Sequence, residues 1–505
     1  MHAVPKSQLH TTHPRKMLIP TSRRSATASR PYALTATALA LALSACTALV
    51  PAPANTPSLP VSSVWSGLAA AETMTSVPTP LARWWLRFDD PLLVALIDET
   101  LRANQSVRSA VAALVQSRAL RDVQAAALVP GVTGSASAQR NRVDASSANA
   151  FRAGFDASWE PDIFGGTRAA VAVADADTHA SAAMLGDVQV SVAAEVAVDY
   201  MQWRGLQERL VIARANLEGQ LEALQITQWR AQAGLATVLE VEQARSSAEQ
   251  TRALIPALQT TAAQTEHALA ALSRNAPDGL HARLDPPSAA PVAQGSLVLD
   301  IPAETLRQRP DVRVAEARVV AAAARVTQAD AARYPSFKLG GSIGLASLSL
   351  GSLVNGSSVV SALLANVAGP IFDGGASVAQ VRAQQAALDQ ARSGYDTAVL
   401  TALRDVEDSL VALRNDRERL VSLRAAADAA GNAALLARQR FDSGLIDFQV
   451  VLDTQRTVLI TQQNVAATAA DFNADHVRLY KALGGGWEPS DPLADSMLHT
   501  PPSRP

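Results

Sequence analysis

The sequence predicts a mainly α-helical protein with a β part, built from long coiled helices and four β-strands in an internal two-fold repeat. Three observations predict it. Two long stretches without proline, Gly166 to Ala233 and Gly375 to Asp442, contain runs in which apolar residues recur every three or four positions, as in coiled helices. Segments of alternating apolar and polar residues precede both stretches, as in half-buried strands. The same short motifs recur in the same order in the two halves.

The first 45 residues have the composition of a secretory signal peptide. Arg23, Arg24 and Arg30 precede an apolar run from Tyr32 to Ala45, and small residues end that run. Cys46 follows directly and resembles the lipobox cysteine of bacterial lipoproteins. The resemblance implies cleavage before Cys46, acylation of its thiol and a lipid-anchored extension over residues 46–80. Because Cys46 is the only cysteine, no intramolecular disulfide can form.

Composition excludes several function classes. A formal charge of −2 over 505 residues gives no basis for nucleic-acid binding. The eight histidines show no metal-ligand spacing, and no nucleophile–base pattern or phosphate-binding glycine loop stands out. We therefore expect no enzyme, no metal site and no cofactor other than the covalent lipid on Cys46. Past the signal segment we find no run of 18 apolar residues, so a membrane crossing should use a closed β-barrel.

The two repeats define the expected domains. The first covers residues 81–275, with a helix, strands at about 130–142 and 150–161, and a helical hairpin at about 165–275 whose tip lies near 234. A linker rich in Pro, Ala, Gly and Ser follows over 276–302. The second repeat covers 303–487, with a helix, strands at about 335–346 and 358–371, and a hairpin at about 374–483 with its tip near 444. A disordered tail is predicted over 488–505.

The alternating segments admit two interpretations. They can be half-buried strands of a soluble sheet, or strands of about 10 residues that cross a bilayer with apolar side chains toward lipid. The fourth segment, Val359 to Val367, has the least clear alternation. Four strands cannot close a barrel, because about eight is the smallest packed size. A membrane barrel would therefore need several chains, eight strands from a dimer or twelve from a trimer, and the residues alone do not choose.

Motifs spread over residues 80 to 487 resemble those of the TolC-like outer-membrane efflux channels. The likeness is specifically to their lipoprotein branch, the NodT-type factors of resistance–nodulation–division pumps. The matching segments are Trp85–Pro91, Arg309–Ala317, Tyr334–Ser336, Pro370–Gly375, Asp405–Asp408, Val451–Arg456 and Leu479–Trp487.

This resemblance implies a homotrimer with a 12-strand outer-membrane β-barrel and a periplasmic tunnel of coiled helices. It also implies a periplasmic adaptor protein and an inner-membrane resistance–nodulation–division transporter as partners. The expected function is a passive conduit that carries small molecules from the periplasm to the exterior, with the chain lipid-anchored in the outer membrane. The alternatives are the channel of a one-step protein secretion system and, less favoured, a periplasmic coiled-coil scaffold lipoprotein.

The resemblance also implies site residues at the hairpin tips. The family's tip aspartate in its Val-Leu-Asp motif maps onto Asp453, and Glu242 is the repeat counterpart of Asp453. A second tip aspartate of some members is replaced here by Val450. Three copies of Asp453 would form an acidic ring that favours cations. The adaptor is expected at Gly234, Leu235, Gly444 and Leu445. Arg245 and Arg456, just past the tips, are candidates for gate ion pairs.

Overall fold

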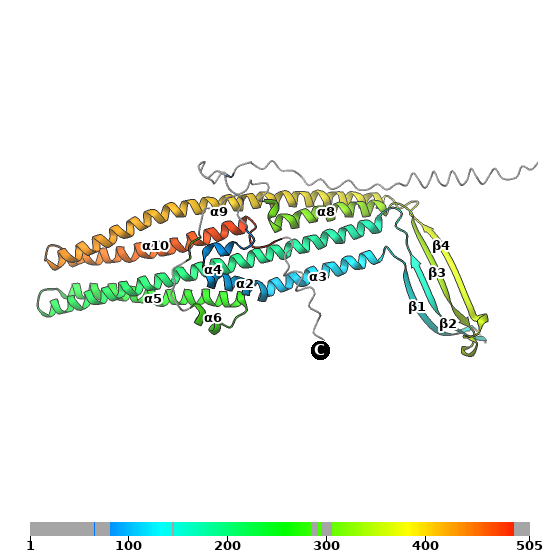
Figure 1. The fold of residues 1–505 in the computed structure, drawn as a ribbon, viewed down its shortest axis with the longest axis horizontal. Coiled ribbons are helices and arrows are strands. Elements are labelled where there is room, and N and C mark those ends of the chain that lie inside the picture. The colour runs from blue at the N-terminus through cyan, green and yellow to red at the C-terminus, as the bar shows by residue number, and fades with distance from the viewer. Residues whose placement is uncertain (1–64, 66–80, 144–145, 285–290, 294–305, 489–505) are drawn as a thin grey trace, which may run out of the picture. The chain divides into compact units, whose positions relative to one another are not determined.

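The structure is a computed structural model that describes Trp65 and residues 81–143, 146–284, 291–293 and 306–488. All of them lie in one compact unit, Pro51–Pro505. The predicted signal peptide, Cys46, most of the 46–80 extension and nearly all of the tail lie outside the described residues. The predicted fold class is confirmed, because long helices and four antiparallel strands alternate in two similar halves (Figure 1).

The helices include two of great length. Helices α4 and α9 each have 67 residues, which corresponds to about 100 Å at 1.5 Å per residue. The helical elements are η1 (Trp84–Phe88), α2 (Pro91–Ala103), α3 (Gln105–Ala126), α4 (Gly166–Gln232), α5 (Val238–Ser273), α6 (Pro277–Leu284), α8 (Pro310–Ala331), α9 (Ala376–Asp442) and α10 (Phe448–Ala482), with short 3-10 turns η2 (Leu350–Ser352) and η3 (Gly356–Ser358).

The internal repeat is visible in the order of the elements. In the first half α3 leads into two strands, the long helix α4 and the returning helix α5. In the second half α8 leads into two strands, α9 and α10. The first part of the segment predicted as a linker, residues 276–302, forms the helix α6. Leu280 and Leu284 of α6 are fully buried in the main core cluster, and burial of two leucines one turn apart favours a helix over an extended connection.

The four strands form one antiparallel sheet in the order β1-β2-β3-β4: β1 (Gly131–Val143), β2 (Ser146–Trp159), β3 (Ser336–Ser347) and β4 (Val359–Ala368). The register places Phe155 opposite Gly134 on one side and Ile343 on the other. Because side chains alternate between faces, this face of the sheet carries Phe155, Ile343 and Leu363. The opposite face carries Ser135, Asp156 and Lys338 on the first three strands.

The helices pack in two layers that share α4 and α9. Near the sheet the order of packed neighbours is α3, α4, α8 and α9. Toward the hairpin tips it is α5, α4, α10 and α9 (Figure 1). By length and composition α4 could cross a membrane, but 56% of its most apolar window is buried inside the fold. That burial fits a core helix that packs against α3, α8 and α10.

The main core lies at the C-terminal ends of α5 and α10, away from the hairpin tips. Trp84 stacks on Tyr480 with ring centroids 5.2 Å apart, and Phe88 meets Tyr480 edge to face. Trp65, the one described residue of the N-terminal extension, is 1% exposed and joins a cluster with Val312, Val406 and Leu479. Trp65 is thereby fixed against the helices of the second repeat.

Candidate functional site

The first hairpin tip is a glycine turn followed by a capped helix. After α4 ends, Gly234 adopts a φ of 73°, a left-handed conformation that glycine tolerates best. The backbone N–H of Leu235 donates to the Arg230 carbonyl, as in a Schellman turn. Thr237 then caps α5 in a reciprocal capping box with Glu240. The turn is therefore determined by local chemistry.

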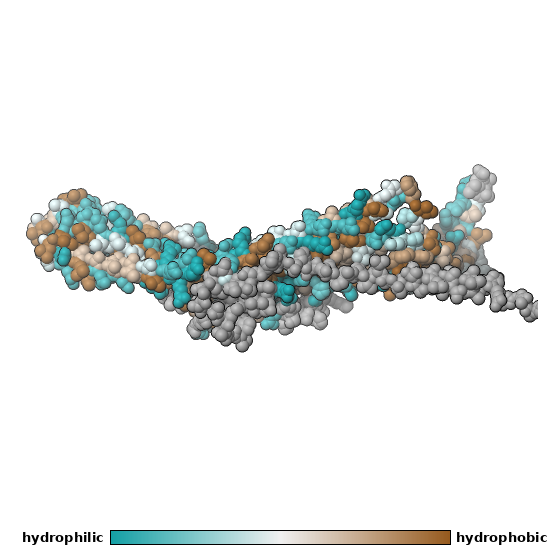
Figure 2. Space-filling view, turned by 90° about the horizontal axis from the view of Figure 1, so that it is seen from above, coloured by the Kyte–Doolittle hydropathy of each residue, from teal (hydrophilic) through white to brown (hydrophobic). Residues whose placement is uncertain are grey.

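The second tip repeats this design. Gly444 has a φ of 70°, the Leu445 N–H donates to the Arg440 carbonyl, and the Asp447 side chain caps α10 by accepting from the Gln449 N–H. Leu235 and Leu445 are 72% and 73% exposed. The structure thus places all four predicted docking residues at the hairpin ends, where Figure 2 shows apolar side chains gathered at the surface.

The two tip carboxylates each pair with an arginine on the same helix. A guanidinium nitrogen of Arg245 lies 3.1 Å from a Glu242 carboxylate oxygen, and one of Arg456 lies 3.9 Å from Asp453. Gln449 Nε2 also donates to Asp453 at 3.0 Å. All four charged side chains are about half exposed. Each acid thus lies beside an arginine three residues further along its own helix, and no ion pair among the described residues joins the two acids to the opposite hairpin.

Other contacts hold the two hairpins together above the tips. Ala244, Ala437, Phe448, Val451 and Leu452 form a buried cluster. The Arg230 guanidinium lies 4.5 Å from the centre of the Phe441 ring, and Arg438 pairs with Glu222 at 3.1 Å. Because these contacts join α4 to α9, α4 and α9 are coupled close to the tip acids.

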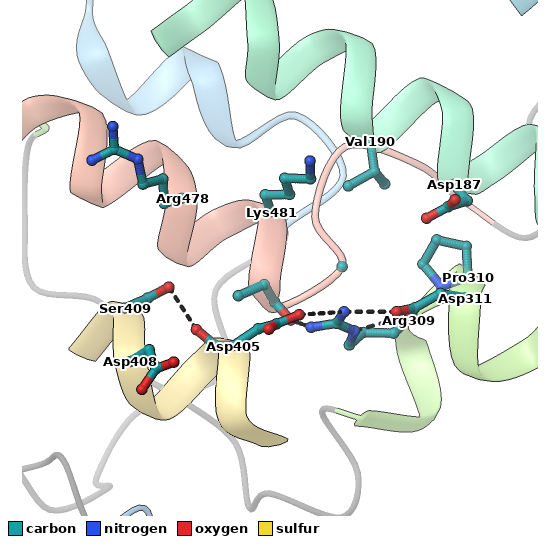
Figure 3. A pocket seen from close by; sticks show the side chains of 12 residues that line it. Asp187, Val190, Arg309, Pro310, Asp311, Asp405, Asp408, Ser409, Arg478 and Lys481 are labelled. Atoms are coloured by element: carbon teal, nitrogen blue, oxygen red, sulfur yellow. Dashed lines mark hydrogen bonds and ion pairs between the residues drawn. The ribbon is translucent and has the colours of Figure 1, made fainter. Parts of the chain in front are cut away.

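A buried arginine ties α8, α9 and α10 together far from the tips. Arg309 lies at a cavity of about 270 Å³, and Figure 3 shows its guanidinium between Asp311 and Asp405. Two of its nitrogens contact Asp311 at 2.7 and 3.0 Å, one contacts Asp405 at 3.3 Å, and another donates to the Ala482 carbonyl at 2.6 Å. Burial lowers the pKa of Arg309, but the two carboxylates outweigh it and raise the pKa above its usual value.

In the sequence this segment stands out only as a match to the efflux-channel family. Pro310 stands in the first turn of α8, where its missing N–H costs little. The role of Arg309 was missed. Its carboxylate partner Asp405 stands in the family-matching segment Asp405–Asp408, but only the fold brings positions 309 and 405 together.

The end of the sheet nearest the helices carries an aromatic cluster. Phe164 stacks on Tyr334 with ring centroids 4.8 Å apart and lies 6.4 Å from Phe337. Trp159 Nε1 donates to the Leu128 carbonyl at 3.1 Å. Aromatic side chains at one end of an apolar strand band are typical of a membrane interface.

Within the described residues, no group of three or more His, Cys, Asp or Glu side chains is placed to hold a metal ion. The candidate site has two parts instead. One is a sheet with one apolar face and open strand edges, and the other is the pair of hairpin tips with exposed leucines and paired charges. An unclosed sheet with one apolar face, continued by helical hairpins, defines the class of outer-membrane channels that have a helical tunnel.

Comparison with known proteins identifies the family. The family described as outer membrane efflux protein matches residues 96–273 and 301–485, so the chain belongs to it. The toluene efflux pump outer membrane protein TtgF of Pseudomonas putida is 32% identical over 469 residues, covering 89% of this chain and 96% of that protein. The outer membrane protein OprJ of Pseudomonas aeruginosa is 30% identical over 467 residues, covering 90% and 96%.

Solved structures agree. The outer-membrane channel OprN has a TM-score of 0.80 and 32% identity, with 86% of this chain and 98% of that chain covered. The outer membrane protein VceC of Vibrio cholerae, at 24% identity and a TM-score of 0.76, shares the fold over 81% of this chain and all of that chain. The chain is an outer-membrane channel component of an efflux pump.

Proposed function

We propose that three copies of the chain form a passive conduit with a 12-strand barrel and a tunnel of coiled helices. The observation that carries the proposal is the four-stranded sheet, in which β1 and β4 each pair with one strand only among the described residues. Unpaired backbone groups in lipid cost several kcal/mol each, so the sheet must be closed by other copies. Acyl chains on Cys46 would add an anchor in the same outer membrane, and no enzymatic step is needed.

The tip acids form the periplasmic gate in this proposal. Asp453 and its repeat counterpart Glu242 would face the tunnel axis, so that three copies create an acidic constriction. Arg456 and Arg245 lie within ion-pair distance of them and would temper the repulsion between copies. Exposed pairs of this kind contribute only about 0–1 kcal/mol each, which suits a constriction that must open.

The glycine turns at the tips are the proposed docking site for a periplasmic adaptor, which would connect the channel to an inner-membrane resistance–nodulation–division transporter. Leu235 and Leu445 are largely exposed on hydrogen-bonded turns, and a partner that covers these two leucines would remove their apolar surface from water, which is favourable. Energy for export would come from the transporter. A one-step protein secretion channel shares the fold, but the efflux proteins among the relatives favour the pump.

The cargo class follows from the same relatives. TtgF is named for toluene efflux and another relative, OpmQ of Pseudomonas aeruginosa, for pyoverdine export. We therefore propose small organic molecules as the exported class for this chain.

Crosslinking from the tip tests the docking proposal. Leu445→Cys places a thiol on an exposed turn, and a thiol-reactive photo-crosslinker should capture a periplasmic adaptor in intact cells, identified by mass spectrometry. Val421→Cys, 65% exposed on α9 and about 35 Å from the tip by helix rise, is the matched control and should capture much less adaptor. Capture of only other copies of this chain at position 445, or equal capture at 421, would refute tip docking.

Neutralising the gate acid tests the acidic constriction. Asp453→Asn in a reconstituted channel should lower the cation-to-anion permeability ratio about two- to fivefold, because the substitution removes three negative charges, one from each copy, from a narrow ring. Glu222→Gln removes a carboxylate of similar exposure (58% against 57%) that pairs with Arg438, and it should leave the ratio unchanged. An unchanged ratio in Asp453→Asn would show that Asp453 does not face the ion path.

A further inference from the structure

The two hairpin tips share a backbone design but differ in the chemistry of their surfaces. The left-handed glycines Gly234 and Gly444, and the capping residues Thr237 and Asp447, align the two tips residue by residue. The leucine that follows each glycine is about equally exposed in both tips. The other apolar side chains of the tips are not equivalent.

The first tip carries three exposed apolar side chains that the second tip lacks. They are Trp229 in the last turn of α4, with Val238 and Leu239 in the first turn of α5, and they are 58%, 74% and 66% exposed. At the equivalent positions the second tip has Gln439, Phe448 and Gln449. The phenylalanine is buried, at 2% exposure, in the cluster that joins the hairpins. The first tip is therefore the more apolar of the two.

The exposure of Trp229 does not arise from a missing neighbouring copy. Toward the tips the helices pack in the order α5, α4, α10, α9 (Figure 1), so α4 already has a helix on each side. The exposed Val238 and Leu239 of α5, and Leu435 and Leu436 of α9, lie on the outer helices of that row, where another copy can cover them. Trp229 lies about 95 Å along α4 from Gly166, so membrane lipid cannot cover it either.

The heptad pattern of α4 places Trp229 on the face that carries α2. Ala194 and Met201 belong to the main core cluster, which also contains residues of α2. Trp229 follows them at five and four whole heptads, and residues at whole heptads share a face of a coiled helix. Buried residues at steps of seven show that α4 keeps this period toward its end: Ala213, Gln220 and Thr227.

That face is the outside of the proposed tunnel. Helix α2 packs against both α4 and α5, so it forms an additional layer on one side of the row of helices. The inner side of a tunnel must stay free for the cargo, and the side that carries α2 is therefore the outer one. Trp229 thus faces the periplasm next to the first glycine turn, within reach of a partner that approaches the tip.

We propose that the first hairpin tip is the primary docking site for the periplasmic adaptor, with Trp229 as its anchor, and that the second tip binds the adaptor more weakly. This inference rests on the proposed function, in which an adaptor docks at the tips. Tryptophan is among the residues that contribute most to binding at protein interfaces. Burial of its ring removes apolar surface from water, whereas Gln439 offers no such gain. The matching surface of the adaptor is an apolar recess.

Paired thiols at equivalent positions compare the two tips. Ala233→Cys and Ser443→Cys each replace the exposed residue that follows a long helix. A thiol-reactive photo-crosslinker in intact cells should capture about threefold more adaptor, identified by mass spectrometry, from position 233 than from position 443. The unmodified chain, with Cys46 alone, gives the background.

Substitution of the tryptophan tests the anchor. Trp229→Gln, which gives the first tip the residue of the second, should lower adaptor capture from position 233 about fivefold and leave capture from position 443 unchanged. Val211→Gln is the matched control, because Val211 is also 58% exposed on α4 and lies about 27 Å from Trp229 along the helix. Capture in that variant should equal that of the unsubstituted reporter chain.

The outcomes separate this inference from the proposed function. Adaptor capture from position 233 that does not respond to Trp229→Gln would overturn the anchor and leave tip docking standing. Capture of no adaptor from either position would overturn tip docking itself. Capture of another copy of this chain through Trp229 would also overturn the inference. Should Trp229→Gln lower the amount of trimer in the membrane, Gln439→Trp provides the reciprocal test: it should raise capture from position 443 about twofold or more, and unchanged capture would refute the inference.

Discussion

Replacing Arg309 with leucine should lower the free energy of unfolding by about 3 kcal/mol and reduce the amount of channel in the outer membrane. The Arg309 side chain is 9% exposed and binds two carboxylates and the Ala482 carbonyl. Removing one partner of a buried ion pair costs about 3–5 kcal/mol, and partial solvation of Asp311 and Asp405 places the value at the low end. Urea unfolding of the purified channel in detergent measures it.

Arg404→Leu is the matched control for this prediction. Arg404 also contacts Asp405, at 3.0 Å, but its side chain is 67% exposed. Surface pairs contribute about 0–1 kcal/mol, so this variant should be close to the unmodified channel. Arg309→Lys should fall between the two, because lysine keeps the charge and loses the two-pronged contact with Asp311. Equal stability of the Arg309→Leu and Arg404→Leu variants would show that the buried contacts of Arg309 do not stabilise the packing of α8, α9 and α10.

Arg309 illustrates the limit of reading this sequence. The long helices were predictable, because their periodicity extends over many turns without proline, and so were the glycine turns, since a left-handed residue is a local requirement. The partners of Arg309 come from positions 311, 405 and 482, of which only the first is near in sequence. Long-range ion pairs depend on how the helices pack, which local patterns do not specify.

The strands show a related limit. In β2 polar and apolar residues alternate cleanly, because one face of the strand is apolar and the other is not. In β4 the neighbours Leu363 and Leu364 lie on opposite faces and are both exposed, so alternation is weak even though the strand pairs fully with β3. The helix α6 was missed because its eight residues carry little periodicity, and burial of Leu280 and Leu284 provides what local propensity does not.

Close contact of glycines joins the two halves of the sheet and leads to the second large prediction. Gly154 of β2 and Gly344 of β3 lie directly opposite each other. A Cβ added at Gly344 would lie 2.7 Å from the Ala153 carbonyl oxygen and 2.9 Å from the Gly154 Cα. Both neighbours are backbone atoms, so a side chain at this position can be accommodated only if the two strands separate.

Gly344→Val should therefore abolish assembly of the barrel and leave little heat-modifiable protein in the outer membrane. The variant disrupts the pairing of β2 with β3, the only strand pairing between the two repeats among the described residues. Gly340→Val is the control, because it lies on the same strand and the same face and its Cβ would have no neighbour closer than 3.9 Å. Since valine favours strands, that variant should assemble normally. Normal assembly of Gly344→Val would mean that β2 and β3 are not in this register in the membrane, whereas failure of both variants would mean that the close contact of Gly344 with β2 is not the cause of the defect.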